Sequence, residues 1–248
     1  MMQWRALLRL SIFLSGILIT PLAQANGDGI ISWHSTNIQL LRGHDYELGS
    51  QDRSLITFEH ANGWTYGDFF MFVDYTFPDD GDTAYYAEFS PRFSLGKITG
   101  RDFSYGIIKD ILVSTAIEKP KYQKARYLYG GAIDLSLPGF DFFSNNLYVR
   151  DDPTLHGKTW QVTLAWKRPF TIGRTSWVTE GFADFAGAEG GARPNQLIVP
   201  RLLLDVGALT NIGENKVWVG MEYSYWHNKF GVDGKTESVP QLQMKWVF

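Results

Sequence analysis

Cysteine is absent from the 248 residues of the chain, which excludes disulfide frameworks, thiolate metal sites and cysteine nucleophiles together. Charge of one sign is not in excess either. The 23 Lys and Arg against 26 Asp and Glu give a net charge of −3, so the basic stripe that nucleic acids require is lacking. Long apolar runs are missing after residue 25, and the mean hydropathy is −0.17, which excludes a bundle of membrane-spanning helices. A soluble all-β domain and a β-barrel that lies in lipid remain, because barrels alternate apolar and polar residues.

The N-terminal segment has the organisation of an export signal. Two arginines precede an apolar run over residues 10–19, and the segment ends in an Ala-x-Ala sequence at Ala25. We therefore predict a signal peptide over residues 1–25 and one mature domain over residues 26–248. A retained membrane anchor is the alternative, but the apolar run is short for a membrane-spanning helix.

The C-terminal segment alternates with a period of two. Leu242, Met244, Trp246 and Phe248 share one face, and glutamine and lysine occupy the other. A terminal strand that ends in phenylalanine is similar to the closing strand of bacterial outer-membrane barrels, where it serves as the assembly signal. We therefore expect a strand with an apolar outside and a polar inside.

The same alternation recurs along the whole mature chain and predicts twelve strands. We expect them at about residues 35–41, 54–62, 64–75, 84–94, 108–117, 126–135, 146–150, 160–167, 177–185, 201–205, 217–224 and 241–248. The predicted fold class is all-β, a twelve-stranded antiparallel transmembrane β-barrel of the bacterial outer membrane. A soluble sandwich would place the charged faces in water, but it leaves the apolar faces and Phe248 unexplained.

The predicted connections fall into two groups. Asn62-Gly63 is a type I′ hairpin signal, and Pro138-Gly139 marks a second short turn. The alternate connections are richer in charge, namely residues 43–53, 76–83, 118–124, 151–158, 185–195 and 227–237. With an even number of strands, the termini and short turns face the periplasm and the charged connections face outward.

Aromatic and ionisable side chains share the polar face of the predicted strands. Alternate residues of a strand share one face, and we call this rule parity. By parity the inward candidates are Glu59, Asp68, Phe70, Phe72, Asp74, Glu88, Arg92, Tyr148, Arg150, Glu180, Phe182 and Glu222. Twelve strands leave a slot narrow enough for these side chains to touch a small solute. Phe70 and Phe72 between Asp68 and Asp74 suit a flat base that carries a polar ribose. The alternative is that the charges pair with one another and, with the rings, fill and brace the lumen.

Three segments carry a resemblance to a known family. Residues 88–106 contain Pro-Arg-Phe-Ser followed by a Ser-Tyr-Gly turn, residues 68–74 form an aromatic strand bounded by aspartates, and residues 180–185 read Glu-Gly-Phe-Ala-Asp-Phe. These features resemble the Tsx-like nucleoside channels (the Tsx/OmpK group), over about residues 33–248. The resemblance implies a monomeric twelve-stranded outer-membrane barrel that passes nucleosides through a narrow lumen lined by aromatic and ionisable residues. One departure is the eighth strand, where Gln161, Thr163 and Ala165 replace the alternating basic residues of that family.

Other functional classes have weaker sequence support. A barrel lipid hydrolase would need a serine beside His60, and Ser50 and Ser54 are near it in sequence, but no Gly-x-Ser-x-Gly elbow is present. The five histidines are isolated, so neither a metal site nor a cofactor is predicted. A passive receptor or adhesion barrel, for a phage for example, remains open because its loops alone would carry that role. The expected partners are a small solute, outer-membrane lipid and the barrel-assembly machinery, with no nucleic acid.

Overall fold

The computed structural model describes residues 30–248, so the predicted signal peptide lies outside the described residues. The strands are β1 (Ile31–Gly43), β2 (Arg53–Trp64), β3 (Gly67–Pro78), β4 (Ala84–Ser94), β5 (Ile108–Pro120), β6 (Arg126–Leu135), β7 (Phe142–Asp151), β8 (Thr159–Ile172), β9 (Thr175–Ala186), β10 (Asn195–Asp205), β11 (Val217–His227) and β12 (Glu237–Val247). A short helix, α1 (Leu95–Thr99), follows β4, and a 3-10 turn, η1 (Lys229–Gly231), follows β11. No helix within residues 30–248 is long and apolar enough to cross a membrane.

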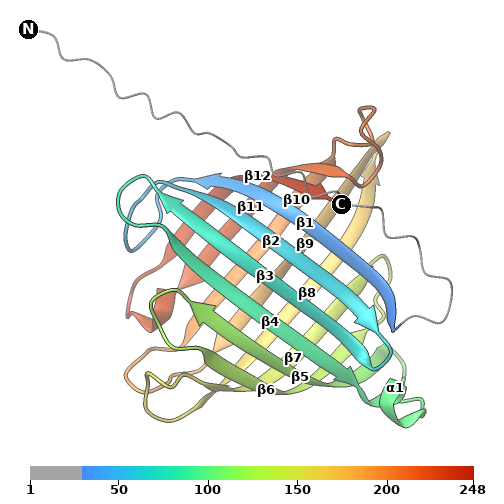
Figure 1. Cartoon of the computed structure of the whole chain (residues 1–248), viewed down its shortest axis with the longest axis horizontal. Helices are drawn as coiled ribbons and strands as arrows, with labels where there is room; N and C mark the ends of the chain where they lie inside the picture. The colour runs from blue at the N-terminus through green and yellow to red at the C-terminus, as the bar shows by residue number, and fades with distance from the viewer. Residues whose placement is uncertain (1–29) are drawn as a thin grey trace, which may run out of the picture.

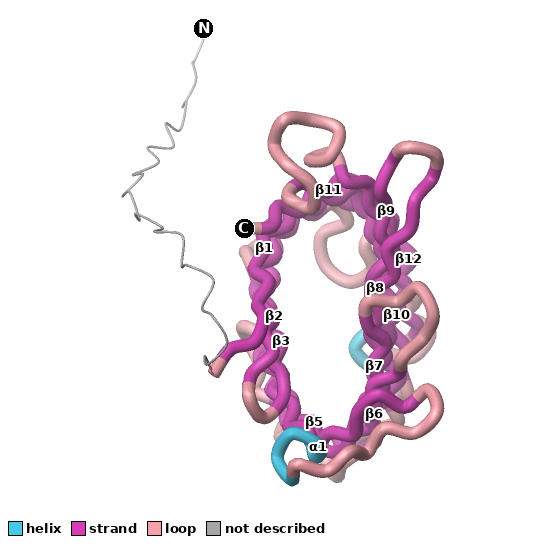
Figure 2. Tube along the Cα trace, turned by 90° about the vertical axis from the view of Figure 1, so that its right-hand side faces the viewer, coloured by secondary structure: helices cyan, strands magenta, loops and turns pink. Residues whose placement is uncertain are grey.

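The strands close into a single antiparallel barrel (Figure 1). Each strand pairs with its neighbours in the chain, and β1 pairs with β12 from Asn37 opposite Val247 to Gly43 opposite Gln241. Viewed along its length, the barrel has an elongated, oval outline, with β3 and β8 on opposite long sides (Figure 2). The predicted twelve-stranded fold is therefore confirmed, with strands longer than expected at several ends.

The two faces of the wall have the reverse of a soluble protein's polarity. Large apolar side chains of the outer face are exposed, among them Ile38, Leu40, Ile56, Phe58, Phe89, Leu147, Leu202, Met221, Leu242 and Met244. Polar side chains of the inner face are buried, among them Asn37, Gln39, Glu59, Glu180, Glu222, Gln241 and Gln243. Since successive residues of a strand point to opposite faces, this pattern follows from the period of two in the sequence. It is the pattern of a barrel whose wall meets lipid.

One predicted turn is wrong, and glycine packing explains why. Asn62 and Gly63 lie inside β2, and the turn to β3 is formed by Thr65 and Tyr66. A Cβ atom at Gly63 would lie 2.1 Å from Nε1 of Trp33, so glycine is needed here for the close approach of that ring. The Pro138-Gly139 turn is confirmed, and Gly139 has the positive φ of 81° that favours glycine.

The connections lie close to the predicted positions. The charged connections are all at the loop end, the end opposite the start of β1 and the end of β12, at residues 44–52, 79–83, 121–125, 152–158, 187–194 and 228–236. At the other end, residues 95–107 and 206–216 form two longer connections, as the predicted strand bounds imply. Side-chain caps stabilise both, because Ser94 Oγ accepts from the backbone of Lys97 at 3.1 Å and Asp205 accepts from the backbone of Asn215 at 2.7 Å.

Candidate functional site

The inner face carries all of the predicted site residues, and their pairing register shows it directly. Phe72 of β3 lies opposite Glu59 on one side and Glu88 on the other, and Asp68 lies opposite Arg92. Residues that oppose each other across a ladder share a face of the sheet. The structure brings these side chains together in four groups, each described below, and their role in solute binding stays a prediction.

The first group, the Arg201 cluster, crosses the interior from β10 to β2. It consists of Arg201 and Lys245 with Glu59, Glu180 and Glu222. Arg201 donates to Glu222 at 2.6 Å and to Glu59 at 3.0 Å, and lies 3.7 Å from Glu180. Lys245 donates to Glu180 at 2.6 Å. The bond from β10 to β2 spans three intervening strands of the barrel wall, so it ties distant parts of the wall together.

Amide side chains extend this packing toward the β1–β12 seam. Asn37 donates to Glu59 at 3.1 Å, and Gln241 donates to Glu222 at 2.9 Å. Gln243 donates to Gln39, and both of these glutamines are 0% exposed. The interior beside the seam is therefore filled by hydrogen-bonded side chains. This agrees with the alternative given above, in which interior side chains pair with one another and brace the lumen.

The second group, the Arg92 cluster, joins β3, β4 and β6. The guanidinium of Arg92 makes two bonds to Asp68, at 2.7 and 2.8 Å, and also donates to Asp134 at 2.8 Å. Beside it, the hydroxyls of Ser114 and Tyr148 lie 2.7 Å apart and are buried. Tyr148 therefore packs in the wall and does not project freely into the interior.

The third group, the Arg150 cluster, lies near the loop end. It consists of Arg126 and Arg150 with Glu118, Asp152 and Glu189. Arg150 donates to Glu118 at 2.9 Å, and Arg126 donates to Asp152 at 2.6 Å. In the loops above, burial raises the pKa of Glu189, whereas hydrogen bonds from Thr154 and Arg126 outweigh burial and lower the pKa of Asp152.

The fourth group is an aromatic row with carboxylates beside it. The ring centroids of Phe70 and Phe72 are 5.7 Å apart, and those of Phe72 and Tyr86 are 5.6 Å apart. Across the ladder Phe72 lies opposite Glu88, and Asp74 lies opposite Tyr86. Phe70 is 37% exposed although it points inward, so this part of the interior is open to solvent.

Some inner-face residues of β3, β4 and β9 keep solvent access beside these rings, and we call this set the accessible strip. They are Phe70, Phe72, Asp74, Tyr86, Glu88, Phe182 and Asp184. In Figure 2, β3 and β8 lie on opposite long sides of the oval. The strip is partly accessible, as are Asp68 and Asp134 of the Arg92 cluster, whose side chains are 24% and 21% exposed.

Several residues of these groups were missing from the predicted set. Tyr86, Asp134, Asp184, Arg201 and Lys245 all take part in the contacts above. Tyr86 and Asp184 each lie two residues from a predicted inward neighbour on the same strand, Glu88 and Phe182, and Lys245 lies on the predicted polar face of the last strand. Their partners are not visible in the sequence.

The hydrolase alternative has no supporting contacts. His60 lies on the outer face, where its Nδ1 lies 2.7 Å from Thr36 Oγ1 and its ring packs 5.5 Å from Phe69. Ser50 donates to the carbonyl of Asp52, and Ser54 accepts from Arg42. Within residues 30–248 no group of three or more His, Asp or Glu is arranged to hold a metal ion.

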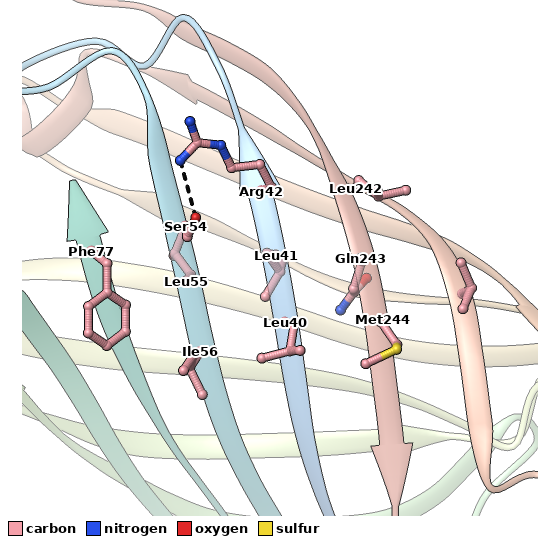
Figure 3. Close-up of a pocket in the computed structure, with 11 residues that line it drawn as sticks. Leu40, Leu41, Arg42, Ser54, Leu55, Ile56, Phe77, Leu242, Gln243 and Met244 are labelled. Atoms are coloured by element: carbon pink, nitrogen blue, oxygen red, sulfur yellow. Dashed lines mark hydrogen bonds between the residues drawn. The ribbon is translucent and has the colours of Figure 1, made fainter. Parts of the chain in front are cut away.

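An apolar groove of about 600 Å³ lies on the wall beside the β1–β12 seam (Figure 3). Outward side chains line it, including Leu40, Ile56, Phe77 and Met244. Arg42 borders it at the loop end and donates to Ser54 at 3.1 Å. Since these side chains belong to the outer face, the groove is separate from the interior.

Comparisons with solved structures show the fold. The chain is similar to the KdgM porin with a TM-score of 0.51 and 7% identity, over 86% of this chain and 99% of that one. It also matches the outer membrane protein Omp33 of Acinetobacter baumannii with a TM-score of 0.40 and 11% identity, over 89% and 100% of the two chains. No family model and no curated protein matches the sequence. The likeness to the KdgM porin shows the fold alone, a closed barrel like that of a porin.

Proposed function

We propose that the protein is an outer-membrane channel for the facilitated diffusion of small solutes, with nucleosides as its preferred solutes. The accessible row of Phe70, Phe72 and Tyr86, set among carboxylates inside a closed barrel, is the observation that carries this proposal. The channel has no catalytic step and needs no cofactor. We place it in the bacterial outer membrane because the outer face of the barrel is apolar and the N-terminal segment has the organisation of an export signal.

Aromatic side chains near both ends of the wall support a place in a membrane. Tyr75 and Tyr85 pair near the loop end at 6.1 Å, and Trp246 and Phe248 pair near the opposite end at the same distance. Aromatic girdles at both interfaces flank the apolar band of outer-membrane barrels. The wall would contact lipid all around, and we propose that the protein is a monomer.

Nucleoside preference is supported by the chemistry of the strip. A base stacks on aromatic faces, and carboxylates accept hydrogen bonds from ribose hydroxyls. The resemblance of residues 68–74 to the Tsx-like channels concerns this same strand. Because Gln161, Thr163 and Ala165 are uncharged, we expect stacking against β3, with β8 as a neutral opposite wall.

The alternative function, a passive receptor, is supported by contacts between the loops. They are tied to one another, since Asn228 donates to the carbonyl of Pro194 at 3.0 Å and Arg193 pairs with Asp233 at 3.1 Å. Lys229 is buried and pairs with Glu237 beneath them, where burial lowers the pKa of Lys229. A rigid surface of this kind suits a phage or another ligand that binds from outside.

Solute flux separates the two functions. Protein extracted from the outer-membrane fraction should produce discrete current steps in planar lipid bilayers, and uridine or adenosine should reduce that current while ribose does so less. Current without nucleoside block would retain the channel and reject its preferred solute. Absence of current from heat-modifiable, folded protein would favour the passive receptor, and recovery only as soluble periplasmic protein would overturn both.

The C-terminal residue provides a test of membrane assembly. The backbone N–H of Phe248 donates to the carbonyl of Thr36 at 3.0 Å, next to the last register pair of the β1–β12 seam. Deletion of Phe248 is expected to reduce folded protein in the outer membrane while export across the inner membrane continues, measured by fractionation and heat-dependent gel mobility. Phe248→Tyr, which keeps the ring, is the control. Normal assembly of the truncated chain would remove this residue's proposed role as a signal for the assembly machinery.

A further inference from the structure

The charged clusters of the interior do not balance. The Arg92 cluster sets one cation against two carboxylates, Asp68 and Asp134. The Arg201 cluster sets two cations against three carboxylates. The Arg150 cluster also sets two cations against three carboxylates. Each cluster therefore keeps one formal negative charge when all its groups are ionised.

Three further carboxylates have no cation beside them. Asp74, Glu88 and Asp184 belong to the accessible strip, and none forms an ion pair with any residue in the range 30–248. Their partners are hydroxyls: Thr57 donates to Asp74 at 2.5 Å, Thr163 donates to Asp184 at 2.6 Å, and Ser90 donates to Glu88. A hydroxyl donor supports a carboxylate without neutralising it, so each of these groups adds negative charge where solutes have access whenever it is ionised.

The remaining inner-face cations are engaged elsewhere. Lys167 pairs with Asp141 at 3.3 Å, near the end of the barrel where β1 begins and β12 ends. At the opposite end Arg53 donates to the carbonyl of Ser50 at 2.8 Å and lies 4.5 Å from the ring centroid of Tyr46. Neither side chain reaches the carboxylates of the strip through an ion pair. Acidic charge therefore dominates the path that solutes would follow.

Ring faces alternate with carboxylates at the centre of the strip. On the β3–β4 ladder Phe72 is opposite Glu88, Asp74 is opposite Tyr86, and the rings of Phe72 and Tyr86 contact each other between the two acids. An aromatic face attracts a cation through its quadrupole, and an adjacent carboxylate adds a direct charge interaction. This combination suits an organic ammonium ion better than an inorganic anion or an organic acid.

We infer that the channel is cation-selective, and that its accessible strip favours organic ammonium ions over anionic solutes. The inference rests on the proposed channel function and specifies the charge of what passes. Asp74, Glu88 and Asp184 are its selectivity-determining residues, with Phe72 and Tyr86 providing the ring faces. Bilayer measurements of ion selectivity test it without knowledge of the natural solute.

The experiment measures reversal potentials of the full-length mature protein under a KCl gradient, and then with tetramethylammonium chloride. At about 0.1 M salt, where the Debye length is about 10 Å, we expect cations to be at least about threefold more permeant than chloride. The preference should weaken toward about 1 M salt, where screening shortens that length to about 3 Å. Tetramethylammonium should carry current and keep the same sign of the reversal potential.

The variant Asp74→Asn/Glu88→Gln/Asp184→Asn removes the three charges and keeps oxygen acceptors for the hydroxyl donors. We expect it to lower the cation-to-chloride permeability ratio to about half or less at about 0.1 M salt, while single-channel conductance stays within about twofold. Asp233→Asn, at an exposed loop acid, is the matched control and should leave the ratio unchanged. If the triple variant fails to fold, Asp74→Asn alone should still lower the ratio measurably.

The outcomes separate this inference from the proposed function. Folded protein without current would overturn the channel itself. Current with equal or anion-favouring permeability in the wild-type protein would overturn the inference alone. A cation preference that is undiminished in the triple variant would also overturn it, because the selectivity would then arise entirely from other residues such as the three ion clusters.

Discussion

Replacing Arg201 with methionine is expected to lower the free energy of unfolding of the barrel by about 3–5 kcal/mol, the usual cost of removing one partner from a buried ion pair. Arg201 bonds to Glu59 and Glu222 and lies close to Glu180, so the variant leaves three carboxylates with Lys245 as their only cation. Methionine fills a similar volume without replacing the charge. The loss comes mainly from carboxylates left close together in a buried setting.

Urea-induced unfolding in lipid vesicles, followed by tryptophan fluorescence, measures this change. Arg193→Met is the matched control, since Arg193 pairs with Asp233 in a loop where their side chains are 61% and 71% exposed. An exposed pair of this kind contributes at most about 1 kcal/mol. If Arg201→Met costs no more than Arg193→Met, the Arg201 cluster is well hydrated and does not brace the barrel.

The fold was predictable because strand parity is a local property. A period of two assigns every residue of a strand to one of two faces, and a slip by one residue would turn the whole apolar face inward. The sequence therefore placed Phe72, Glu88 and Glu180 on the inner face without knowledge of their neighbours. The fifth and sixth strands, whose alternation is weak, were still located as candidate segments in the middle of the chain, and they bring the count to twelve.

The partners of the interior charges were not predictable in the same way. Arg201 and Glu59 are 142 residues apart and meet only because the barrel closes and its oval end brings β10 near β2. Closure and cross-section depend on the relative shift of all strands, which no single segment encodes. The sequence could therefore state that charges fill the lumen but could not say which carboxylates remain without a cation.

Local signals failed where a tertiary contact competed with them. Asn62-Gly63 has the composition of a hairpin turn, but the ring of Trp33 packs where a side chain at Gly63 would lie, and β2 continues to Trp64. In residues 95–107, which the predicted strand bounds leave as a connection, no such contact competes, and the cap at Ser94 begins α1. A glycine signal distinguishes turn from close approach only when the neighbouring strand is known.

Replacing both Phe70 and Phe72 with leucine is expected to weaken nucleoside block of the channel current at least tenfold. Leucine keeps much of the apolar volume but removes the ring faces, and stacking contributes about 1–3 kcal/mol per base. A loss of about 1.4 kcal/mol corresponds to a factor of ten in affinity. Bare ion conductance should change little, because the carboxylates of the strip remain. Titration of the current with uridine measures the block.

The double variant Phe58→Leu/Phe89→Leu is the matched control, since it removes two rings from the outer face of the neighbouring strands β2 and β4. It should leave nucleoside block unchanged, which separates loss of the interior rings from a general effect of fewer aromatic residues. The opposite result for Phe70 and Phe72, an unchanged block with a large rise in conductance, would show that these rings only narrow the lumen. Nucleoside preference would then be wrong, but the barrel and its negatively charged interior would stand, because neither depends on base stacking.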